Sequence, residues 1–408
     1  MTRSNAFVRG LENAFMRVAL AGIRWRGGGV ATRAMGPMSR MAEPSGSQRV
    51  LVCKWCCMGD AIVSLYALRE FKNRHPEIGI DMLVSARIAE VYRRAPEIER
   101  VHVLPVTGKR LWLELLSPGL WIKLTRLLVH LRRQRYSQFV DLELYRGTGP
   151  ILKRLIGIPY SRGFSVEGAL PKYHDFEVPL PRKMPEWQCF YRVLGMDIPD
   201  CKPLALYPRP AIMPGAQDFA EGSAQAEDAA SDSEYRPRSR RIGIVFGSSF
   251  NWPQKKWPWE KYAELITLLA GDGHEFILLG TGDERAEAGK IIGKAQGRIR
   301  DTTGCLDFPG LQKEVADCDL IVGNDTGTMH LAAACDVPTV TLFGPTDPDK
   351  WNALTSTPMF LESLPCRPCY YLGSMPPCGH FSCLRKLEAP LVAERIRGIL
   401  AAPDGALK

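Results

Sequence analysis

The sequence predicts an α/β protein made of two halves, each with a parallel sheet covered by helices. Strand-like apolar segments alternate with helical periods from Val50 onward, and this alternation is typical of parallel sheets. An acidic stretch at 209–240 interrupts the alternation, which resumes at Arg241. A chain of 408 residues is long enough for two domains. Two such halves predict a ligand cleft between them.

Composition and charge narrow the class of protein. The chain is 45% hydrophobic and 24% charged, as in soluble globular proteins, and no apolar run reaches the ~18 residues that span a bilayer. The net charge of +9 is concentrated in residues 107–172, where twelve Lys and Arg stand against four Asp and Glu. Such a stretch indicates either an anionic partner or a solvated basic face.

Residues 1–48 are predicted to be a basic N-terminal extension. Phe7, Leu11 and Phe15 lie roughly on one helical face, and the segment holds seven Arg against two Glu. It is therefore either an amphipathic helix that lies in a membrane interface or a poorly ordered extension. Arg interrupts every apolar run, so no secretory signal is predicted.

The first predicted domain covers 49–208. Strands are expected at 50–56, 79–85, 100–106 and 138–144, because these segments are apolar and end at turns or polar residues. Amphipathic helices are expected at 61–74, 86–94, 111–135 and 149–156. Strands that alternate with helices in this way predict one parallel sheet.

The linker at 209–240 precedes a second domain at 241–408. Between Pro214 and Tyr235 there are six acidic residues and no basic ones, a composition that predicts a flexible segment. Strands are then expected at 241–246, 274–280, 318–323 and 339–344, and helices at 259–270, 285–295 and 328–334.

The first strand-to-helix turn holds the first candidate for chemistry. Gly59 allows a ligand to approach the backbone, and Asp60 follows at or near a helix N-terminus. Two interpretations are open for Asp60. It is a catalytic carboxylate at the mouth of the sheet, or it is the N-cap of the helix, a position where Asp is favoured.

The second half offers two loops with phosphate-binding or hydroxyl-binding chemistry. Ser248 and Ser249 follow a strand and precede Lys255, so they supply hydrogen-bond donors and a positive charge for a phosphate. Asp283 and Glu284 follow the next strand and either hold ribose or sugar hydroxyls or cap the following helix.

The sharpest element is the segment at 321–334. A strand runs into Asn324-Asp325-Thr326-Gly327 and then into a helix of small residues. Exposed amides at that helix start, with the Thr326 hydroxyl beside them, predict a site for a pyrophosphate. His330 falls in the first turn of the helix, where it faces the phosphates or has a structural role.

Four motifs in this order resemble glycosyltransferase family 9, which contains the ADP-heptose:lipopolysaccharide heptosyltransferases. They are Met58-Gly59-Asp60, the Lys-x-Trp-Pro of 255–258, the Asn-Asp-Thr-Gly-x-x-His of 324–330, and Phe-Gly-Pro-Thr-Asp-Pro at 343–348. The resemblance runs from about Val50 to about Lys386, with the linker excepted. It implies a GT-B architecture of two Rossmann-like domains that face a central cleft.

The resemblance also implies an inverting transferase that needs no cofactor for catalysis. In this family Asp60 is expected to be the general base, and Lys255 to hold the donor phosphates. Asp325, Thr326, Gly327 and His330 are expected to bind the donor heptose and diphosphate. Glu284 or Asp283 is expected beside the nucleoside.

The acceptor is the part of the function that the sequence leaves most open. Family members usually carry a Gln-containing variant of the segment Asp141–Arg146. We assign the acceptor, an anionic glycolipid or related glycan, to Gly59, Lys109, Arg110 and Arg146. We predict no nucleic-acid partner and a cytoplasmic protein, and contact with the inner membrane stays open.

Three alternatives remain at this stage. A GT-B sugar-nucleotide epimerase would need several acid and base groups around one sugar. A transferase of the same family would use another donor sugar or a protein acceptor. A non-catalytic glycan-binding protein would be expected to lose either Asp60 or the diphosphate loop, and the chain has both.

The twelve cysteines divide into two groups. Eight are scattered as reduced thiols would be, and four lie close together as Cys366-x-x-Cys369 and Cys378-x4-Cys383. The second group has the spacing of metal ligands and predicts a structural zinc or iron ion. Reduced thiols without metal, or a disulfide pair, are the alternatives.

Overall fold

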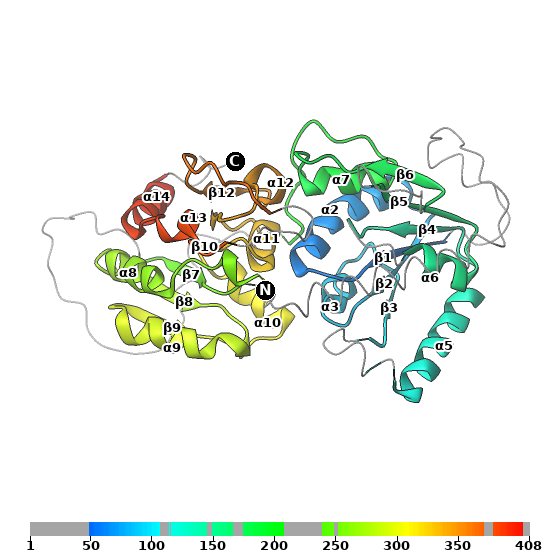
Figure 1. Ribbon diagram of the computed structural model, residues 1–408, viewed down its shortest axis with the longest axis horizontal. Coiled ribbons are helices and arrows are strands. Elements are labelled where there is room, and N and C mark those ends of the chain that lie inside the picture. Colours follow the sequence, from blue (N-terminus) through cyan, green and yellow to red (C-terminus); the bar gives the residue numbers. More distant parts are fainter. Residues whose placement is uncertain are drawn as a thin grey trace, which may run out of the picture. The chain divides into compact units, whose positions relative to one another are not determined.

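Two compact units make up the chain (Figure 1). The computed structural model describes residues 49–106, 114, 116–144, 149–165, 174–207, 239–248, 252–370 and 378–402. The first unit consists of the described residues up to Pro203 together with two later segments, Asp349–Trp351 and the described part of Cys369–Gly379. The second unit consists of the other described residues from Leu204 onward. The extension at 1–48 and residues 209–238 of the predicted linker lie outside the described residues.

The first unit is built on a parallel sheet in the order β3-β2-β1-β4-β5-β6. Its strands are β1 (Arg49–Lys54), β2 (Gly79–Val84), β3 (Arg100–Val103), β4 (Gln138–Asp141), β5 (Tyr160–Ser165) and β6 (Phe176–Pro179). Its helices are α2 (Met58–Arg74), α3 (Ala89–Arg93), α5 (Pro118–Arg133), α6 (Gly149–Ile156) and α7 (Glu186–Val193). The strand order reverses between β1 and β4.

Helices cover both faces of this first sheet. Helix α2 packs against α3 and α7, and α5 packs against α6. Leu51 and Cys53 of β1 join Leu131 and Ile156 in a core beneath α5 and α6. Because side chains alternate along a strand, Lys54 points to the opposite face, where it lies over the ring of Phe190 in α7.

The second unit repeats the plan with a parallel sheet in the order β12-β11-β10-β7-β8-β9. Its strands are β7 (Arg241–Val245), β8 (Glu275–Leu278), β9 (Arg298–Asp301), β10 (Leu320–Asn324), β11 (Thr339–Leu342) and β12 (Ser356–Met359). Its α-helices are α8 (Trp259–Ala270), α9 (Arg285–Lys294), α10 (Phe308–Ala316), α11 (Gly327–Ala334), α13 (Ser382–Arg385) and α14 (Ala389–Ala401). Helix α12 (Pro348–Trp351) follows β11 in the chain, but its last three residues belong to the first unit. Two 3-10 turns, η2 (Pro253–Lys255) and η3 (Gly282–Glu284), follow β7 and β8.

The core of the second unit lies between its sheet and helices α8, α9 and α14. Ile242, Phe276 and Val322 from the strands pack with Leu265 and Val392 from the helices. On the other face α10 packs against α11. The predicted α/β class with two parallel sheets is confirmed, and the strand order reverses between β7 and β10.

Element boundaries differ from the predictions in two informative places. Helix α2 begins at Met58 instead of Ala61, so Asp60 lies inside its first turn. Helix α5 begins at Pro118, because proline fixes the backbone dihedral that a first helical residue needs. Among the described residues, no helix is both long and apolar enough to cross a membrane. The cleft between the two halves remains a prediction.

Candidate functional site

Asp60 lies at the carboxyl edge of the first sheet, where the strand order reverses. Cys57 is the N-cap of α2 and makes no side-chain capping bond, and Asp60 is the third residue of the helix. The interpretation of Asp60 as the N-cap of this helix is therefore wrong. Ligands of open α/β sheets bind at such reversal points, so Asp60 occupies the position that a functional carboxylate would be expected to have.

A fully buried lysine holds this carboxylate. The Lys54 Nζ lies 3.1 Å from Asp60 Oδ2 and 3.7 Å from Glu143 Oε1, and it donates a hydrogen bond to the Leu142 carbonyl at 3.2 Å. Burial alone would lower the pKa of Lys54, but Cys56, the carboxylates of Glu143 and Asp60, and Glu186 together raise it well above its ordinary value. Lys54 is thus a fixed positive charge beneath Asp60.

Glu143 ties the ends of the two central strands together. Its Oε1 accepts backbone hydrogen bonds from Trp55 at 2.6 Å and Cys56 at 3.2 Å, after β1. Its own amide donates to Asp141 Oδ1 at 3.0 Å, at the end of β4. Glu143, within the segment that departs from the family's usual Gln-containing variant, therefore supports the turn that precedes Asp60.

A second carboxyl group faces this cluster without a partner. Glu186 of α7 is 3% exposed, and neither of its oxygens has a hydrogen bond among the described residues. Burial first, and then the charge of Asp60, raise the pKa of Glu186 well above its ordinary value. Lys350, which donates to the Pro181 carbonyl at 2.9 Å, acts in the opposite direction on that pKa.

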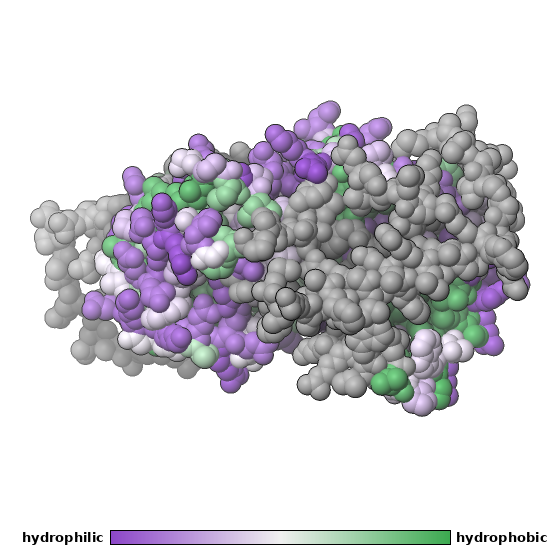
Figure 2. Space-filling view, in the orientation of Figure 1, coloured by the Kyte–Doolittle hydropathy of each residue, from purple (hydrophilic) through white to green (hydrophobic). Residues whose placement is uncertain are grey.

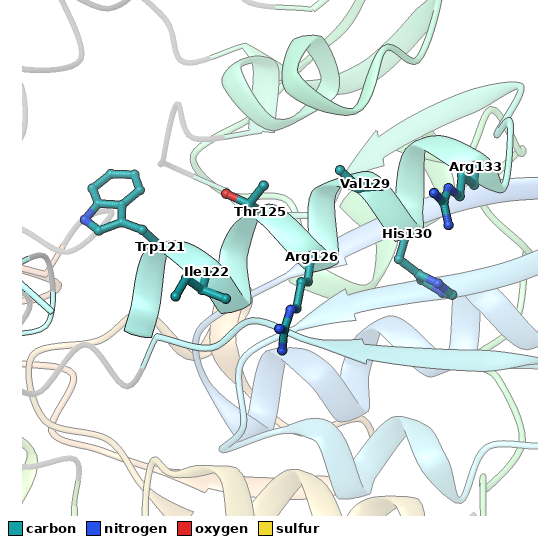
Figure 3. Close-up of a pocket in the computed structure, with 7 residues that line it drawn as sticks. All are labelled: Trp121, Ile122, Thr125, Arg126, Val129, His130 and Arg133. Carbon is teal, nitrogen blue, oxygen red and sulfur yellow. The ribbon is translucent and has the colours of Figure 1, made fainter. Parts of the chain in front are cut away.

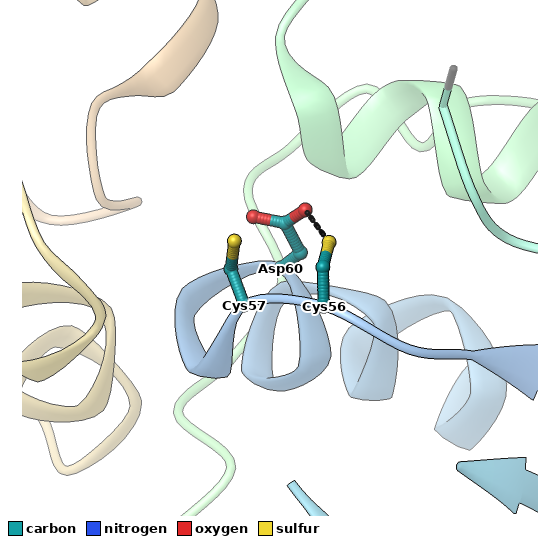
Figure 4. A group of neighbouring side chains, drawn as sticks. All are labelled: Cys56, Cys57 and Asp60. Carbon is teal, nitrogen blue, oxygen red and sulfur yellow. Dashed lines mark hydrogen bonds between the residues drawn. The ribbon is translucent and has the colours of Figure 1, made fainter. Parts of the chain in front are cut away.

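Cys56 and Cys57 flank Asp60 in the same turn (Figure 4). The ligand atoms of the three residues lie within 4.8 Å of one another, and Cys56 donates to Asp60 Oδ2 at 3.5 Å. A hydrogen bond with Cys57 and then burial raise the pKa of the Cys56 thiol well above its ordinary value. Metals bind the thiolate, so this group fits a hydrogen-bonded thiol better than a metal ligand.

The predicted acceptor residues lie mostly outside the described residues. Lys109, Arg110 and Arg146 belong to that undescribed part, and so does Ser249 of the donor loop. Gly59 is buried in the first turn of α2.

In the second unit, Asn324 connects the ends of β10 and β7. Its Nδ2 donates to the carbonyl oxygens of Phe246 at 2.7 Å and Gly247 at 3.0 Å, and its Oδ1 accepts from the Trp257 amide at 2.9 Å. One buried amide side chain therefore positions the loop that precedes Lys255. The reversal point of this second sheet is organised by Asn324.

Asp325 is bound to two partners at the same edge. Its Oδ2 accepts from Lys255 Nζ at 2.8 Å and from Thr346 Oγ1 at 2.8 Å. The structure thus brings together two residues of separate predicted motifs, Lys255 and Asp325. Thr346 connects the third motif, at 343–348, to the pair.

Helix α11 begins directly after this cluster. Thr326 is its N-cap, and the Thr326 hydroxyl is buried without a hydrogen-bond partner among the described residues. His330 is buried one turn further on. Helix N-termini attract anions through their amides and dipole, and a buried hydroxyl without a partner there has an unused donor.

The Glu284 side chain binds backbone groups of the loops around it. The Glu284 carboxylate accepts from the backbone amides of Ser248 at 3.1 Å and Thr281 at 2.8 Å, and it completes a capping box with Thr281. A Cβ at Gly247 would lie 1.9 Å from Glu284 Oε1, so only glycine permits this contact. Asp283 is exposed, and the Ser248 hydroxyl donates to the Trp252 carbonyl at 3.0 Å.

The C-terminal cysteines are reduced, as are all twelve in the chain, so the disulfide alternative is wrong. Cys366 and Cys383 belong to the second unit, and Cys369 and Cys378 to the first. A metal ion at these four thiols stays a prediction.

Sequence reasoning missed Lys54 and Glu186, and it placed Asn324 in a motif without assigning its contacts. Lys54 carried a signal, because this charged residue directly follows the buried apolar run Val50–Cys53. Glu186 carried none, and the contacts of Asn324 come from elements far away in the sequence.

Comparisons with known proteins agree with this architecture. Residues 202–374 match the sequence pattern described as glycosyltransferase family 9 (heptosyltransferase). Lipopolysaccharide heptosyltransferase 2 of Salmonella typhimurium is 29% identical over 74% of this chain and 84% of its own length. Lipopolysaccharide heptosyltransferase 1 of Pseudomonas aeruginosa is 28% identical over 79% of this chain and 86% of its own.

A solved structure extends the agreement to the fold. The ADP-heptose lipopolysaccharide heptosyltransferase II of Escherichia coli superposes with a TM-score of 0.60 at 22% identity, covering 86% of this chain and 98% of that one. The two parallel-sheet units have the GT-B architecture of these heptosyltransferases. Within that class, residues 202–374 match glycosyltransferase family 9, and the proteins that are similar over most of the chain are lipopolysaccharide heptosyltransferases.

Proposed function

We propose that the protein transfers heptose from ADP-heptose to a lipopolysaccharide-core acceptor with inversion at the anomeric carbon. The similar proteins are named lipopolysaccharide heptosyltransferases, and the match with this chain covers most of their length. The observation that carries the proposal here is Asp60, a carboxylate at a sheet reversal point that a buried lysine holds at 3.1 Å.

The reaction is a single displacement. The acceptor hydroxyl oxygen forms a bond to the anomeric carbon of the donor, while the bond from that carbon to the diphosphate oxygen breaks. The electron pair of the broken bond leaves with ADP, and the proton of the hydroxyl goes to Asp60. Catalysis of this type needs orientation, a base and stabilisation of the leaving diphosphate.

The donor is assigned to the second unit. Lys255, Thr326, Gly327 and the start of α11 would hold the diphosphate, because a lysine and helix amides are the groups that take up its charge. Asp325 would fix Lys255 and meet the sugar, and His330 would lie behind the phosphates. Ser248, Ser249, Asp283 and Glu284 would lie on the nucleoside side.

The acceptor is assigned to the first unit, to Gly59, Lys109, Arg110 and Arg146. We propose a cytoplasmic enzyme whose anionic glycolipid acceptor brings it to the inner membrane surface. The basic balance of residues 107–172 supports this partner.

A structural zinc or iron ion at Cys366, Cys369, Cys378 and Cys383 is a further part of the proposal. Its support is the ligand spacing together with the reduced state of the four thiols.

The decisive experiment supplies a panel of nucleotide sugars with and without heptose-deficient lipopolysaccharide and measures nucleoside diphosphate release. We expect ADP release from ADP-heptose that depends on the acceptor. Isomerised sugar nucleotide without release would instead establish an epimerase. Release with another nucleotide sugar or with a protein acceptor would change the substrate, and no turnover at all would indicate a binding protein.

A further inference from the structure

Helix α5 presents a continuous stripe of side chains along one of its faces. The stripe follows the spacing of one helical face and consists of Trp121, Ile122, Thr125, Arg126, Val129, His130 and Arg133 (Figure 3). An open hollow of about 540 Å³ lies along it. The opposite side of α5 carries Leu131, which is fully buried in the core of the first unit.

The stripe exposes more apolar surface than the fold needs. Trp121 is 51% exposed, Ile122 53% and Val129 45%, and Leu155 of the neighbouring helix α6 is 51% exposed. Helix α5 is labelled at the lower right of Figure 1, and green surface gathers in the same region of Figure 2. Contiguous exposed apolar side chains mark interaction sites in soluble proteins, whereas single ones do not.

The charge on helix α5 itself has one sign. Helix α5 carries Lys123, Arg126, Arg132 and Arg133, and residues 115–140 contain no acidic residue. On α6, Arg154 is exposed as well. Aromatic and aliphatic side chains interleaved with Arg and Lys on one exposed helix are the composition of helices that lie in the interface of an anionic membrane.

We propose that the stripe on α5 docks onto the surface of an anionic lipid bilayer, with Trp121, Ile122 and Val129 inserted at the headgroup boundary. Arg126 and Arg133 would then pair with lipid phosphates. The inference rests on the membrane contact proposed above and assigns it to one element. With 16 residues, α5 is about 24 Å long, and it would lie in the plane of the membrane.

Charge complementarity distinguishes this occupant from two others. The extension at 1–48 has seven Arg against two Glu, so it has the same sign as the stripe. A second copy of the chain would bring two identical basic faces together. Both arrangements are repulsive, whereas an anionic bilayer attracts each Lys and Arg near it.

The test is sedimentation of the full-length protein with phosphatidylcholine vesicles, with and without phosphatidylglycerol. We expect binding only when phosphatidylglycerol is present, and weakening by salt. The double change Trp121→Gln and Ile122→Gln should lower the partition coefficient about tenfold or more, since it removes exposed apolar area. The pair Arg126→Gln and Arg133→Gln should lower it about 30-fold at low salt, at roughly fivefold per charge.

Matched controls use exposed residues of the second unit. Ile292→Gln with Leu391→Gln removes comparable apolar area, and Lys313→Gln with Arg395→Gln removes the same charge. These pairs should leave vesicle binding unchanged. All variants replace exposed positions, and an unchanged melting temperature for each would show that the fold is intact.

Two outcomes would overturn the inference in distinguishable ways. If α5 variants bind like the unchanged protein while removal of residues 2–48 abolishes binding, the membrane contact stands and α5 is not its site. If the unchanged protein does not bind phosphatidylglycerol vesicles, both the contact and its assignment fail. ADP release with a delipidated acceptor is measured in parallel, and its loss would instead overturn the proposed transfer.

Discussion

At the scale of single residues, the first unit has several ionisable side chains in its interior, where such groups are rare in folded proteins. Lys54, Glu143 and Glu186 are all buried, and Asp60 is nearly so. Removal of one partner from a buried ion pair costs far more than the pair contributes, because the remaining charge is left without compensation. Such a cluster is retained only where the arrangement itself is useful, and here it fixes Asp60.

The first prediction concerns Asp60 itself. Asp60→Asn keeps the shape of the side chain but removes the base, so turnover should fall by roughly 10²–10⁴. Affinity for ADP should stay constant, as measured by calorimetry. Glu260→Gln is the control, because Glu260 is a first-turn carboxylate of α8 and reports the loss of a favourable helix-dipole interaction alone. Near-normal turnover of the Asn variant would remove Asp60 from the reaction.

Lys54 gives the second prediction. Lys54→Met should lower the free energy of unfolding by roughly 3–5 kcal/mol, since Glu143 loses its countercharge. Adding Glu143→Gln should restore much of this stability but not the turnover. Urea unfolding and kcat are measured on the single and double variants. Recovery of both properties in the double variant would reduce Lys54 to a purely structural role.

The third prediction concerns the contact between Asp141 and His174, which lie 3.6 Å apart. Burial raises the pKa of Asp141 to about 7 and lowers the pKa of His174 to about 4. Between these values both groups are neutral in the folded protein, so the contact is not an ion pair there.

The signs of the two shifts are opposite. The folded protein keeps a proton on Asp141 that the unfolded chain loses above its ordinary pKa, so this group lowers stability as pH rises from about 4 to 7. Below about pH 6.5 the unfolded chain binds a proton on this histidine, whereas His174 in the folded protein stays neutral. This group therefore lowers the free energy of unfolding as pH falls. The two slopes cancel between about pH 4 and 6.5.

Replacing one of the two residues should make the pH dependence of stability due to the other one measurable. Relative to the unchanged protein, His174→Gln should lose stability as pH rises through this window, and Asp141→Asn should gain it, by up to about 1.4 kcal/mol per pH unit. Urea unfolding at a series of pH values measures both. Parallel curves for all three proteins would contradict the neutral pair.

At the scale of elements, both units place their chemistry at the carboxyl edge of the two strands where the order reverses. In the first unit these strands are β1 and β4, and in the second they are β7 and β10. A side chain from one strand end binds the other in each case: Glu143 reaches the turn after β1, and Asn324 the turn after β7. Asp60 and the start of α11 therefore occupy equivalent locations in the two units.

The fourth prediction belongs to α11. Thr326→Val removes a buried hydroxyl without a partner, so the melting temperature without nucleotide should stay constant or rise. The stabilisation by ADP should shrink, because the hydroxyl would no longer donate to the diphosphate. Thr339→Val in β11 is the matched control, since its hydroxyl is also buried without a partner among the described residues but lies outside the site. Equal ADP shifts in the two variants would contradict a diphosphate site at Thr326.

The sequence predicted the strands and helices at this edge better than the side-chain contacts between them. Periodicity located β1, β10 and α11, because strands buried on both faces are continuous apolar runs. It did not reveal that Lys54 reaches Asp60, or that Thr346 reaches Asp325, because those contacts depend on strand order. For Glu284 the sequence left a ligand role and a capping role open, and its oxygens accept two backbone hydrogen bonds, one of them in a capping box.

At the scale of the whole molecule, the repeated plan of two sheets explains why the family was recognisable from four short motifs. Each motif lies at or close to the carboxyl end of a central strand: 58–60 after β1, 255–258 after β7, 324–330 after β10 and 343–348 after β11. The acceptor side stays a prediction, because its assigned basic residues lie outside the described residues.

The fifth prediction concerns the four C-terminal cysteines. If they hold one ion, the purified protein should contain about one equivalent of zinc or iron by elemental analysis. Cys366→Ser should lower both metal content and melting temperature, and Cys318→Ser, a buried cysteine elsewhere, should leave the metal unchanged. A metal-free and equally stable preparation would contradict the site.

The pairing of β1 with β4 also affects how the protein is made. Cys53 and Asp141, which hydrogen-bond across this pair, are 88 residues apart in the chain. At ribosomal rates of about 5–20 residues per second, β1 would leave the exit tunnel roughly 4–18 seconds before its second neighbour β4 leaves it. During that interval the apolar edge Val50–Cys53 has only β2 beside it. Newly made chains should therefore depend on chaperones chiefly before residue 141 emerges.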